Sequence, residues 1–176
     1  MNVTNIYTRF LLLIVLVFST PTLQAQDRIK LTEGMNAPNF ALQDQKGKTI
    51  KLSSFRDKSV VVLYFYPKAG TSGCTKQACG IRDEIVKFKE KNIVVLGVST
   101  DSKKELKRFV RQNKLNFPLL SDFNKVITSK YGVLRDDGKA KRVTFIIDKN
   151  GIIAKIIEVT DVSTHSTEVF EIASQL

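Results

Sequence analysis

The sequence has little of what metal centres and nucleic-acid interfaces are made from. Its 176 residues include one histidine, two cysteines and no tryptophan. So few ligating side chains leave almost nothing for a transition-metal site, and we expect no metal and no cofactor. The formal net charge is +11, but Lys and Arg are spread along the chain and no zinc-finger spacing or aromatic RNA-binding signature occurs. We therefore interpret the basic balance as a solvated surface and expect no nucleic-acid partner.

Long apolar runs are also rare, and the most continuous one lies near the start of the chain. Arg9 precedes nine apolar residues at 10–18, and a polar stretch with Ala25 follows. This pattern is typical of a secretory signal peptide, whereas crossing a membrane takes about 20 apolar residues. We expect residues 1–25 to be removed, leaving one domain at 26–176 that is periplasmic or secreted and not stably bound to a membrane. The alternative is an uncleaved N-terminus that tethers the protein to the membrane.

The two cysteines, Cys74 and Cys79, are only five residues apart. A pair of cysteines in an exported protein ordinarily forms a structural disulfide. Closing so short a loop adds little stability, because the entropic gain from a disulfide grows with loop length. We therefore interpret the two cysteines as reactive groups rather than as a structural disulfide.

The apolar pattern predicts strands alternating with helices. Strands are expected at 40–44, 49–52, 60–66, 93–99, 117–120, 143–148 and 152–159. Helices are expected at 74–91, from 101 or 102 to 113, at 123–131 and at 164–176. The first two and the last two strands form hairpins, the second around an Asn-Gly turn. Helices between buried strands imply an α/β three-layer sandwich with a mixed sheet.

The segment 67–74 follows the buried strand at 60–66, where sites in such sheets tend to lie. Cys74 would stand in the first turn of a helix, where free backbone N–H groups and the helix dipole favour a thiolate. Gly73 would let the backbone approach a small ligand, and Pro67 would stiffen the entry to the loop. Thr71 adds a hydroxyl that can bond a small ligand or the thiolate.

These residues match a known pattern. Pro67-x-x-x-Thr71-x-x-Cys74 resembles the active-site signature of peroxiredoxins. The position of Cys79 resembles that of the resolving cysteine in the peroxiredoxin Q, or bacterioferritin comigratory protein, subfamily. Further segments look like landmarks of this subfamily over nearly all of the chain after residue 25: Asn39-Phe40-x-Leu42-x-Asp44, Gly97-Val98-Ser99-x-Asp101-Ser102, Phe117-Pro118-Leu119-Leu120-Ser121-Asp122, Lys130-Tyr131-Gly132-Val133 and Arg142-x-Thr144-Phe145-x-Ile147-Asp148.

The resemblance implies a thioredoxin-like α/β/α fold with an N-terminal β-hairpin. It implies that Cys74 attacks hydrogen peroxide or an organic hydroperoxide, while Thr71 orients the peroxide and Pro67 shields the sulfenic acid. Arg142 would lie beside the sulfur, where its permanent charge and planar fork of donors stabilise anions. Cys79 would then form a disulfide with Cys74, which a thioredoxin-like protein reduces. The resemblance also implies a monomer.

The predicted helix conflicts with that disulfide. Residues five apart in an ideal helix have Cα atoms about 8.7 Å apart, whereas a disulfide tolerates at most about 7 Å. We therefore expect the segment from Gly73 to about Ile81 to unwind on oxidation. Gly80 would ease this step, because glycine weakens a helix by roughly 1 kcal/mol relative to alanine.

Two other functions stay open on the sequence. One is an exported thiol–disulfide oxidoreductase, although such enzymes normally carry Cys-x-x-Cys rather than Cys-x-x-x-x-Cys. The other is a basic binding module or holdase with a structural disulfide. His165 is expected to be a surface or helix-start residue, and Tyr64 and Tyr66 are expected to lie in the core with hydroxyls at its rim.

Overall fold

Two buried strands form the centre of the sheet in the computed structural model, which describes residues 30–176. β3 (Val60–Phe65) and β4 (Ile93–Ser99) pair in parallel. Both are almost wholly buried because helices or loops cover the two faces of the sheet, which explains their continuous apolar sequences. The expected signal peptide at 1–25 lies outside the described residues.

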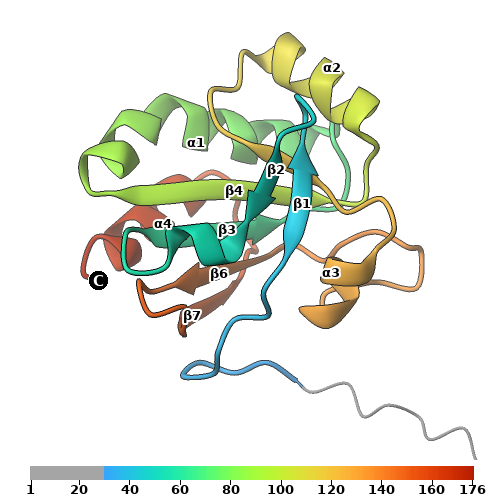
Figure 1. Cartoon of the computed structure of the whole chain (residues 1–176). Coiled ribbons are helices and arrows are strands. Elements are labelled where there is room, and N and C mark those ends of the chain that lie inside the picture. The colour runs from blue at the N-terminus through green and yellow to red at the C-terminus, as the bar shows by residue number, and fades with distance from the viewer. Residues whose placement is uncertain (1–29) are drawn as a thin grey trace, which may run out of the picture.

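The other strands complete a mixed seven-stranded sheet (Figure 1). β5 (Leu119–Ser121) runs parallel to β4, while β6 (Val143–Ile147) runs antiparallel to β3 and pairs with β7 (Ile153–Glu158). The hairpin of β1 (Ala41–Asp44) and β2 (Thr49–Lys51) joins through β1 to β5. The strand order is β2-β1-β5-β4-β3-β6-β7. This arrangement confirms the predicted mixed sheet with its N-terminal hairpin.

Helices cover both faces of the sheet and give three layers. α1 (Ser72–Glu90), α2 (Lys103–Asn113) and α4 (His165–Ala173) pack on one face, and the short α3 (Val126–Lys130) and the 3-10 turn η1 (Leu52–Phe55) pack on the other. Successive residues of β3 point alternately into the two cores. The α/β/α sandwich predicted from the sequence is therefore confirmed.

Most predicted elements differ from the structure at their ends, and two of the short ones show why. The expected helix at 123–131 is reduced to α3, because Lys125 adopts a left-handed conformation at its N-cap and the Asp122 carboxylate binds the Thr128 backbone N–H and hydroxyl. The expected strand at 117–120 is displaced to 119–121. α2 begins at a complete capping box formed by Ser102 and Glu105, one of the two caps predicted.

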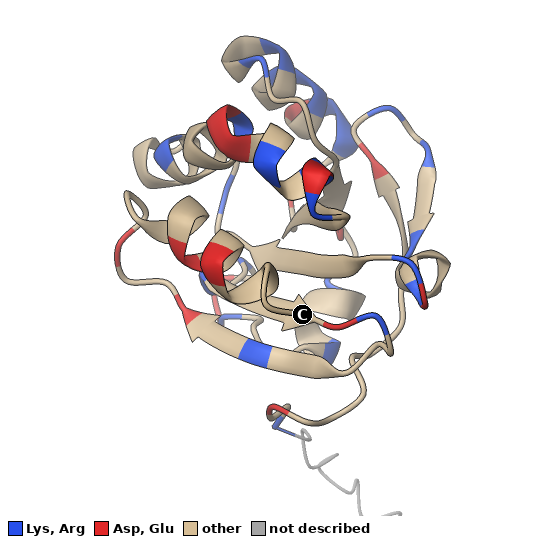
Figure 2. Ribbon diagram, turned by 90° about the vertical axis from the view of Figure 1, so that its left-hand side faces the viewer, with Lys and Arg blue, Asp and Glu red and all other residues tan. Residues whose placement is uncertain are grey.

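Basic residues are most frequent on α2, the helix at the top of Figure 2. This helix contributes five cations and one acid: Lys103, Lys104, Lys107, Arg108, Arg111 and Glu105. Elsewhere in this view Lys and Arg are interspersed with Asp and Glu. Within residues 30–176, no helix is both long and apolar enough to cross a membrane.

Candidate active site

Cys74 lies where the central strand β3 gives way to helix α1. It is the third residue of α1, and its side chain belongs to the core beneath the helix, with 2% of its surface exposed. The helix starts at this point because the Thr71 carbonyl accepts the first helical hydrogen bond, from Thr75 N at 2.8 Å. The sulfur therefore stands in the first turn, where the helix dipole favours an anion.

Arg142 reaches Cys74 from a distant part of the chain. β6 runs antiparallel to β3 and pairs Val143 with Phe65, so the residue before β6 arrives at the end of β3 where α1 begins. Arg142 Nη2 donates to Cys74 Sγ at 3.3 Å. A Cβ on Gly73 would lie 3.3 Å from the same Nη2. Glycine at this position therefore allows the guanidinium to lie against the sulfur without crowding.

A buried polar chain continues from Arg142 to helix α4. Arg142 Nη1 donates to Gln77 Oε1 at 2.5 Å, and Gln77 Nε2 lies 3.2 Å from His165 Nδ1. His165 Nε2 lies 2.8 Å from Thr144 Oγ1. Gln77, Thr144 and His165 are at most 1% exposed. No site role was predicted for these three residues, although the spacing of Gln77 three residues after Cys74 places both on one helix face.

His165 is not a surface residue. It does begin α4, as expected, but its side chain is fully buried. Burial, with a smaller contribution from the charge of Arg142, lowers the pKa of His165 from 6.5 to about 4. The imidazole is therefore neutral at ordinary pH. No pattern in the sequence distinguishes a buried histidine at a helix start from an exposed one.

The expectation for Tyr64 and Tyr66 is wrong in one respect. Both lie in the core as predicted and their rings stack, with centroids 5.5 Å apart. Their hydroxyls do not reach the rim: each is buried without a hydrogen-bond partner in the described part of the chain. Burial raises the pKa of both phenols, so neither supplies a negative charge near Cys74.

The Asp101 carboxylate holds the loop before Cys74. The backbone N–H of Ala69 donates to Asp101 Oδ2 at 2.8 Å, and Ser99 Oγ donates to the same oxygen at 2.8 Å. Thr71 is exposed, and its hydroxyl donates to the Lys68 carbonyl at 3.1 Å rather than to the sulfur. Pro67 is half-buried at the loop entry. Asp101, expected as a possible helix cap, is therefore an anchor of this loop.

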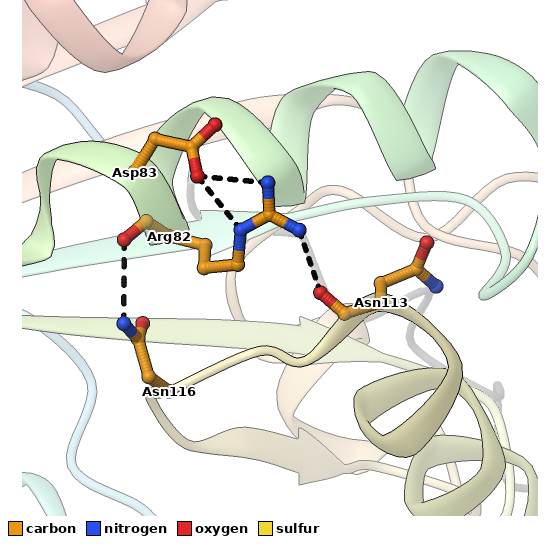
Figure 3. Close-up of polar contacts among 4 residues, drawn as sticks. All are labelled: Arg82, Asp83, Asn113 and Asn116. Atoms are coloured by element: carbon orange, nitrogen blue, oxygen red, sulfur yellow. Dashed lines mark hydrogen bonds and ion pairs between the residues drawn. The ribbon is translucent and has the colours of Figure 1, made fainter.

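Cys79 lies farther along the same continuous helix. It is half-buried, and both cysteines are free thiols. Three residues on, Arg82 connects α1 to the end of α2 and to the loop that follows it (Figure 3). Its Nη1 donates to the Asn113 carbonyl at 2.7 Å, and its own carbonyl accepts from Asn116 Nδ2 at 3.3 Å. Among the described residues, no group of three or more His, Cys, Asp or Glu side chains could hold a metal ion.

Comparison with known proteins shows the family to which this chain belongs. Residues 34–156 match the AhpC/TSA family. The chain is 41% identical over 142 residues to peroxiredoxin Bcp of Escherichia coli, covering 77% of this chain and 90% of that protein. It is 44% identical over 126 residues to the chloroplastic peroxiredoxin Q of Sedum lineare, covering 70% and 67% respectively. The chain belongs to the AhpC/TSA family of peroxiredoxins.

Solved structures agree with the family assignment. Peroxidoxin BcpB from Mycobacterium tuberculosis superposes with a TM-score of 0.78 at 32% identity, covering 83% of this chain and 98% of the other. A PrxQ mutant from Xylella fastidiosa gives 0.75 at 27% identity, covering 80% and 94%. The predicted thioredoxin-like fold and the resemblance to peroxiredoxin Q are thus confirmed, and this peroxiredoxin is a thiol-dependent peroxidase.

Proposed function

We propose that Cys74 and Cys79 carry out a two-cysteine peroxidase cycle. The Cys74 thiolate attacks the terminal oxygen of a hydroperoxide, so that an S–O bond forms as the O–O bond breaks. The departing oxygen takes up a proton and leaves as water or an alcohol, and Cys74 becomes a sulfenic acid. The Cys79 sulfur then attacks Cys74 Sγ, forming the disulfide and releasing water. A dithiol protein restores both thiols by exchange.

The contact between Arg142 and Cys74 carries this proposal. A guanidinium 3.3 Å from the sulfur favours the thiolate and can donate to the oxygen on which negative charge develops. Gly73 also lies at this contact, and we propose that its lack of a side chain lets the backbone approach a small peroxide. For Thr71 and Pro67 we keep the roles that the resemblance implies, orienting the peroxide and shielding the sulfenic acid.

The second step requires α1 to open. Cys74 and Cys79 are five residues apart on an unbroken helix, so their Cα atoms are about 8.7 Å apart, beyond the limit of about 7 Å for a disulfide. We propose that the segment from Gly73 to about Ile81 unwinds on oxidation. The anchor at Arg82 lies directly after this segment and would hold the remainder of the helix in place.

The alternative, an oxidoreductase acting on protein cysteines, fits the site less well. Its attacking sulfur must reach a disulfide in another folded protein, whereas Cys74 is 2% exposed beneath α1. A small hydroperoxide needs far less access. In addition, four residues separate Cys74 from Cys79, whereas two residues typically separate the cysteines of such enzymes.

The apolar run at 10–18 supports export, so we propose a periplasmic or secreted protein, with membrane tethering by an uncleaved N-terminus as the alternative. An exported enzyme requires an exported thioredoxin-like reductant.

We propose that the protein is a monomer, as the resemblance implies. We also propose that it needs no metal or cofactor, because two thiols and a cation suffice for the cycle.

Peroxide consumption and intact mass test the cycle. The reduced protein is expected to consume one equivalent of hydrogen peroxide and to lose two hydrogens from its mass. Cys74→Ser should abolish consumption, while Cys79→Ser should consume one equivalent and accumulate a sulfenic acid that dimedone traps. If the reduced wild-type protein consumes no peroxide within minutes but exchanges with protein disulfides, the oxidoreductase alternative replaces the peroxidase.

A further inference from the structure

The hydrogen-bond chain behind Cys74 has a direction that its chemistry dictates. Arginine only donates, so Gln77 must turn its amide oxygen toward Arg142, and its Nε2 must face His165. An amide nitrogen also only donates. His165 Nδ1, the nearer ring nitrogen at 3.2 Å, must therefore accept with its lone pair. The remaining proton of a neutral ring then lies on Nε2 and is donated to Thr144 Oγ1 at 2.8 Å.

From this geometry we infer that His165 is a positioning residue of the peroxidase. Its Nδ1 lone pair fixes the orientation of the Gln77 amide, and that amide holds the Arg142 guanidinium against Cys74 Sγ. The inference rests on the proposed role of Cys74 and adds a residue from α4, 91 positions further along the chain, to the machinery around the sulfur.

Gln77 alone does not hold this arrangement. The two ends of an amide are nearly equal in size, so an amide without a fixed partner can rotate and present its NH₂ group to the guanidinium, where two donors repel. An acceptor on the far side of Gln77 removes that freedom. Thr144 fixes the imidazole in turn from β6, the strand next to β3.

The network contains no counter-charge that would neutralise Arg142. Gln77 and Thr144 are uncharged, and burial keeps His165 neutral. The nearby phenol of Tyr64, with its ring centroid 6.1 Å from that of His165, is also uncharged. A glutamate in place of Gln77 would hold the guanidinium as well but would cancel its charge. The amide–imidazole pair orients Arg142 and leaves its full charge to the sulfur.

The test compares two replacements of His165 in the full-length reduced protein. His165→Asn keeps a carbonyl oxygen where Nδ1 lies, whereas His165→Phe fills the space and removes the acceptor. Val169→Ala, at a fully buried position of the same helix, controls for a loss of packing. The readouts are kcat/KM for hydrogen peroxide, the pH profile of Cys74 alkylation by iodoacetamide, and the free energy of unfolding.

We expect His165→Phe to lower kcat/KM by about tenfold to a hundredfold, the scale of a misplaced catalytic group, and to move Cys74 alkylation to higher pH. His165→Asn should recover most of both losses. Val169→Ala should lower stability and leave both readouts near wild type. In a double-mutant cycle, Gln77→Leu and His165→Phe should not add, because both act through Arg142.

A His165→Phe protein that reacts and is alkylated like wild type would overturn the inference. So would a His165→Asn protein as slow as His165→Phe, since the acceptor would then not be what matters. Absence of peroxide consumption by wild type would refute the peroxidase cycle instead, and the alkylation profiles would still decide the role of His165.

Discussion

Gly97 of β4 lies directly against the aromatic ring of Tyr64 on the neighbouring strand. A Cβ at position 97 would come within 2.7 Å of both Cζ and the hydroxyl of Tyr64, and within 2.7 Å of a methyl group of Leu119. The two residues are paired in the parallel register of β3 and β4. The Tyr64 ring stacks on that of Tyr66 and packs edge-on against His165, so its position affects the core behind Cys74.

Gly97→Ala should therefore destabilise the protein and lower its rate of reaction with peroxide. Adding a methyl group to a filled core typically costs about 1–3 kcal/mol, and the displaced Tyr64 ring would press on His165. Chemical denaturation should show the loss of stability, and peroxide kinetics should show a lower kcat/KM. An unchanged denaturation midpoint would mean that the ring has free space to move into.

Arg142→Lys should be strongly impaired although it keeps the charge. The guanidinium donates to Gln77 and to Cys74 through two different nitrogens, and a single ammonium cannot reproduce that planar fork. Loss of one such donor typically costs about 10²-fold or more in rate. Lys141→Gln removes the neighbouring exposed charge and should react with peroxide much like wild type. Equal rates for Arg142→Lys and wild type would show that charge alone suffices.

Substitutions of Thr71 can change the rate without changing stability, because the side chain is exposed. Thr71→Val replaces the hydroxyl by a methyl group of similar size, so stability should change little, while kcat/KM should fall if the hydroxyl orients the peroxide. Thr71→Ser should restore the rate. In the structure the hydroxyl donates to the Lys68 carbonyl. A Thr71→Val protein with the wild-type rate would leave only this loop contact as its role.

The Arg82 anchor predicts where unwinding stops. On oxidation, amide hydrogen exchange should accelerate over about residues 73–81 and remain slow beyond Arg82. Arg82→Gln removes the bond to the Asn113 carbonyl, and fast exchange in its oxidised form should extend further into α1. Asp83→Asn, which removes only the exposed pair with Arg82, should keep the wild-type boundary. Identical boundaries in wild type and Arg82→Gln would contradict the anchor, and equal protection in both redox states would contradict the unwinding itself.

Stability should depend on pH through His165. Its pKa is lowered in the folded protein from 6.5 to about 4, so between these values the unfolded chain binds a proton that the folded chain does not. The stabilising contribution is complete above about pH 6.5 and is lost as the pH falls toward about 4, with a total on the order of 3 kcal/mol. Carboxylates titrate partly in the same range, so the measurement is the difference in unfolding free energy between wild type and His165→Asn across that window. A constant difference would contradict the shift.

Much of the fold could be predicted because the pattern of apolar residues is strong. β4 coincides with the predicted segment at 93–99, and the hairpins were signalled by their turns. The elements predicted less well, α3 and β5, are short, so local contacts decide their ends. The left-handed Lys125 and the Asp122 carboxylate determine where α3 starts, and neither effect has a sequence period.

The site divides in the same way. Pro67, Thr71, Gly73 and Cys74 form a local motif that the sequence displays directly. Gln77 and His165 meet only because α1 and α4 approach closely, and Gly80 is part of the reason: a Cβ there would lie 3.3 Å from Ser166 Oγ. From the sequence, Gly80 is expected only to weaken the helix. Its role in helix packing depends on a contact between distant segments, which no local pattern reveals.

The burial of His165 has a practical consequence, because it is the only histidine in the sequence. Its two carbon-bound ring protons give one pair of imidazole signals in a nuclear magnetic resonance spectrum, with no signal from another histidine to overlap. Gln77 lies between the two cysteines, within the segment proposed to unwind, so disulfide formation would take away one hydrogen-bond partner of the ring. The molecule thus contains its own unlabelled reporter, whose chemical shift and titration distinguish the reduced enzyme from the oxidised one.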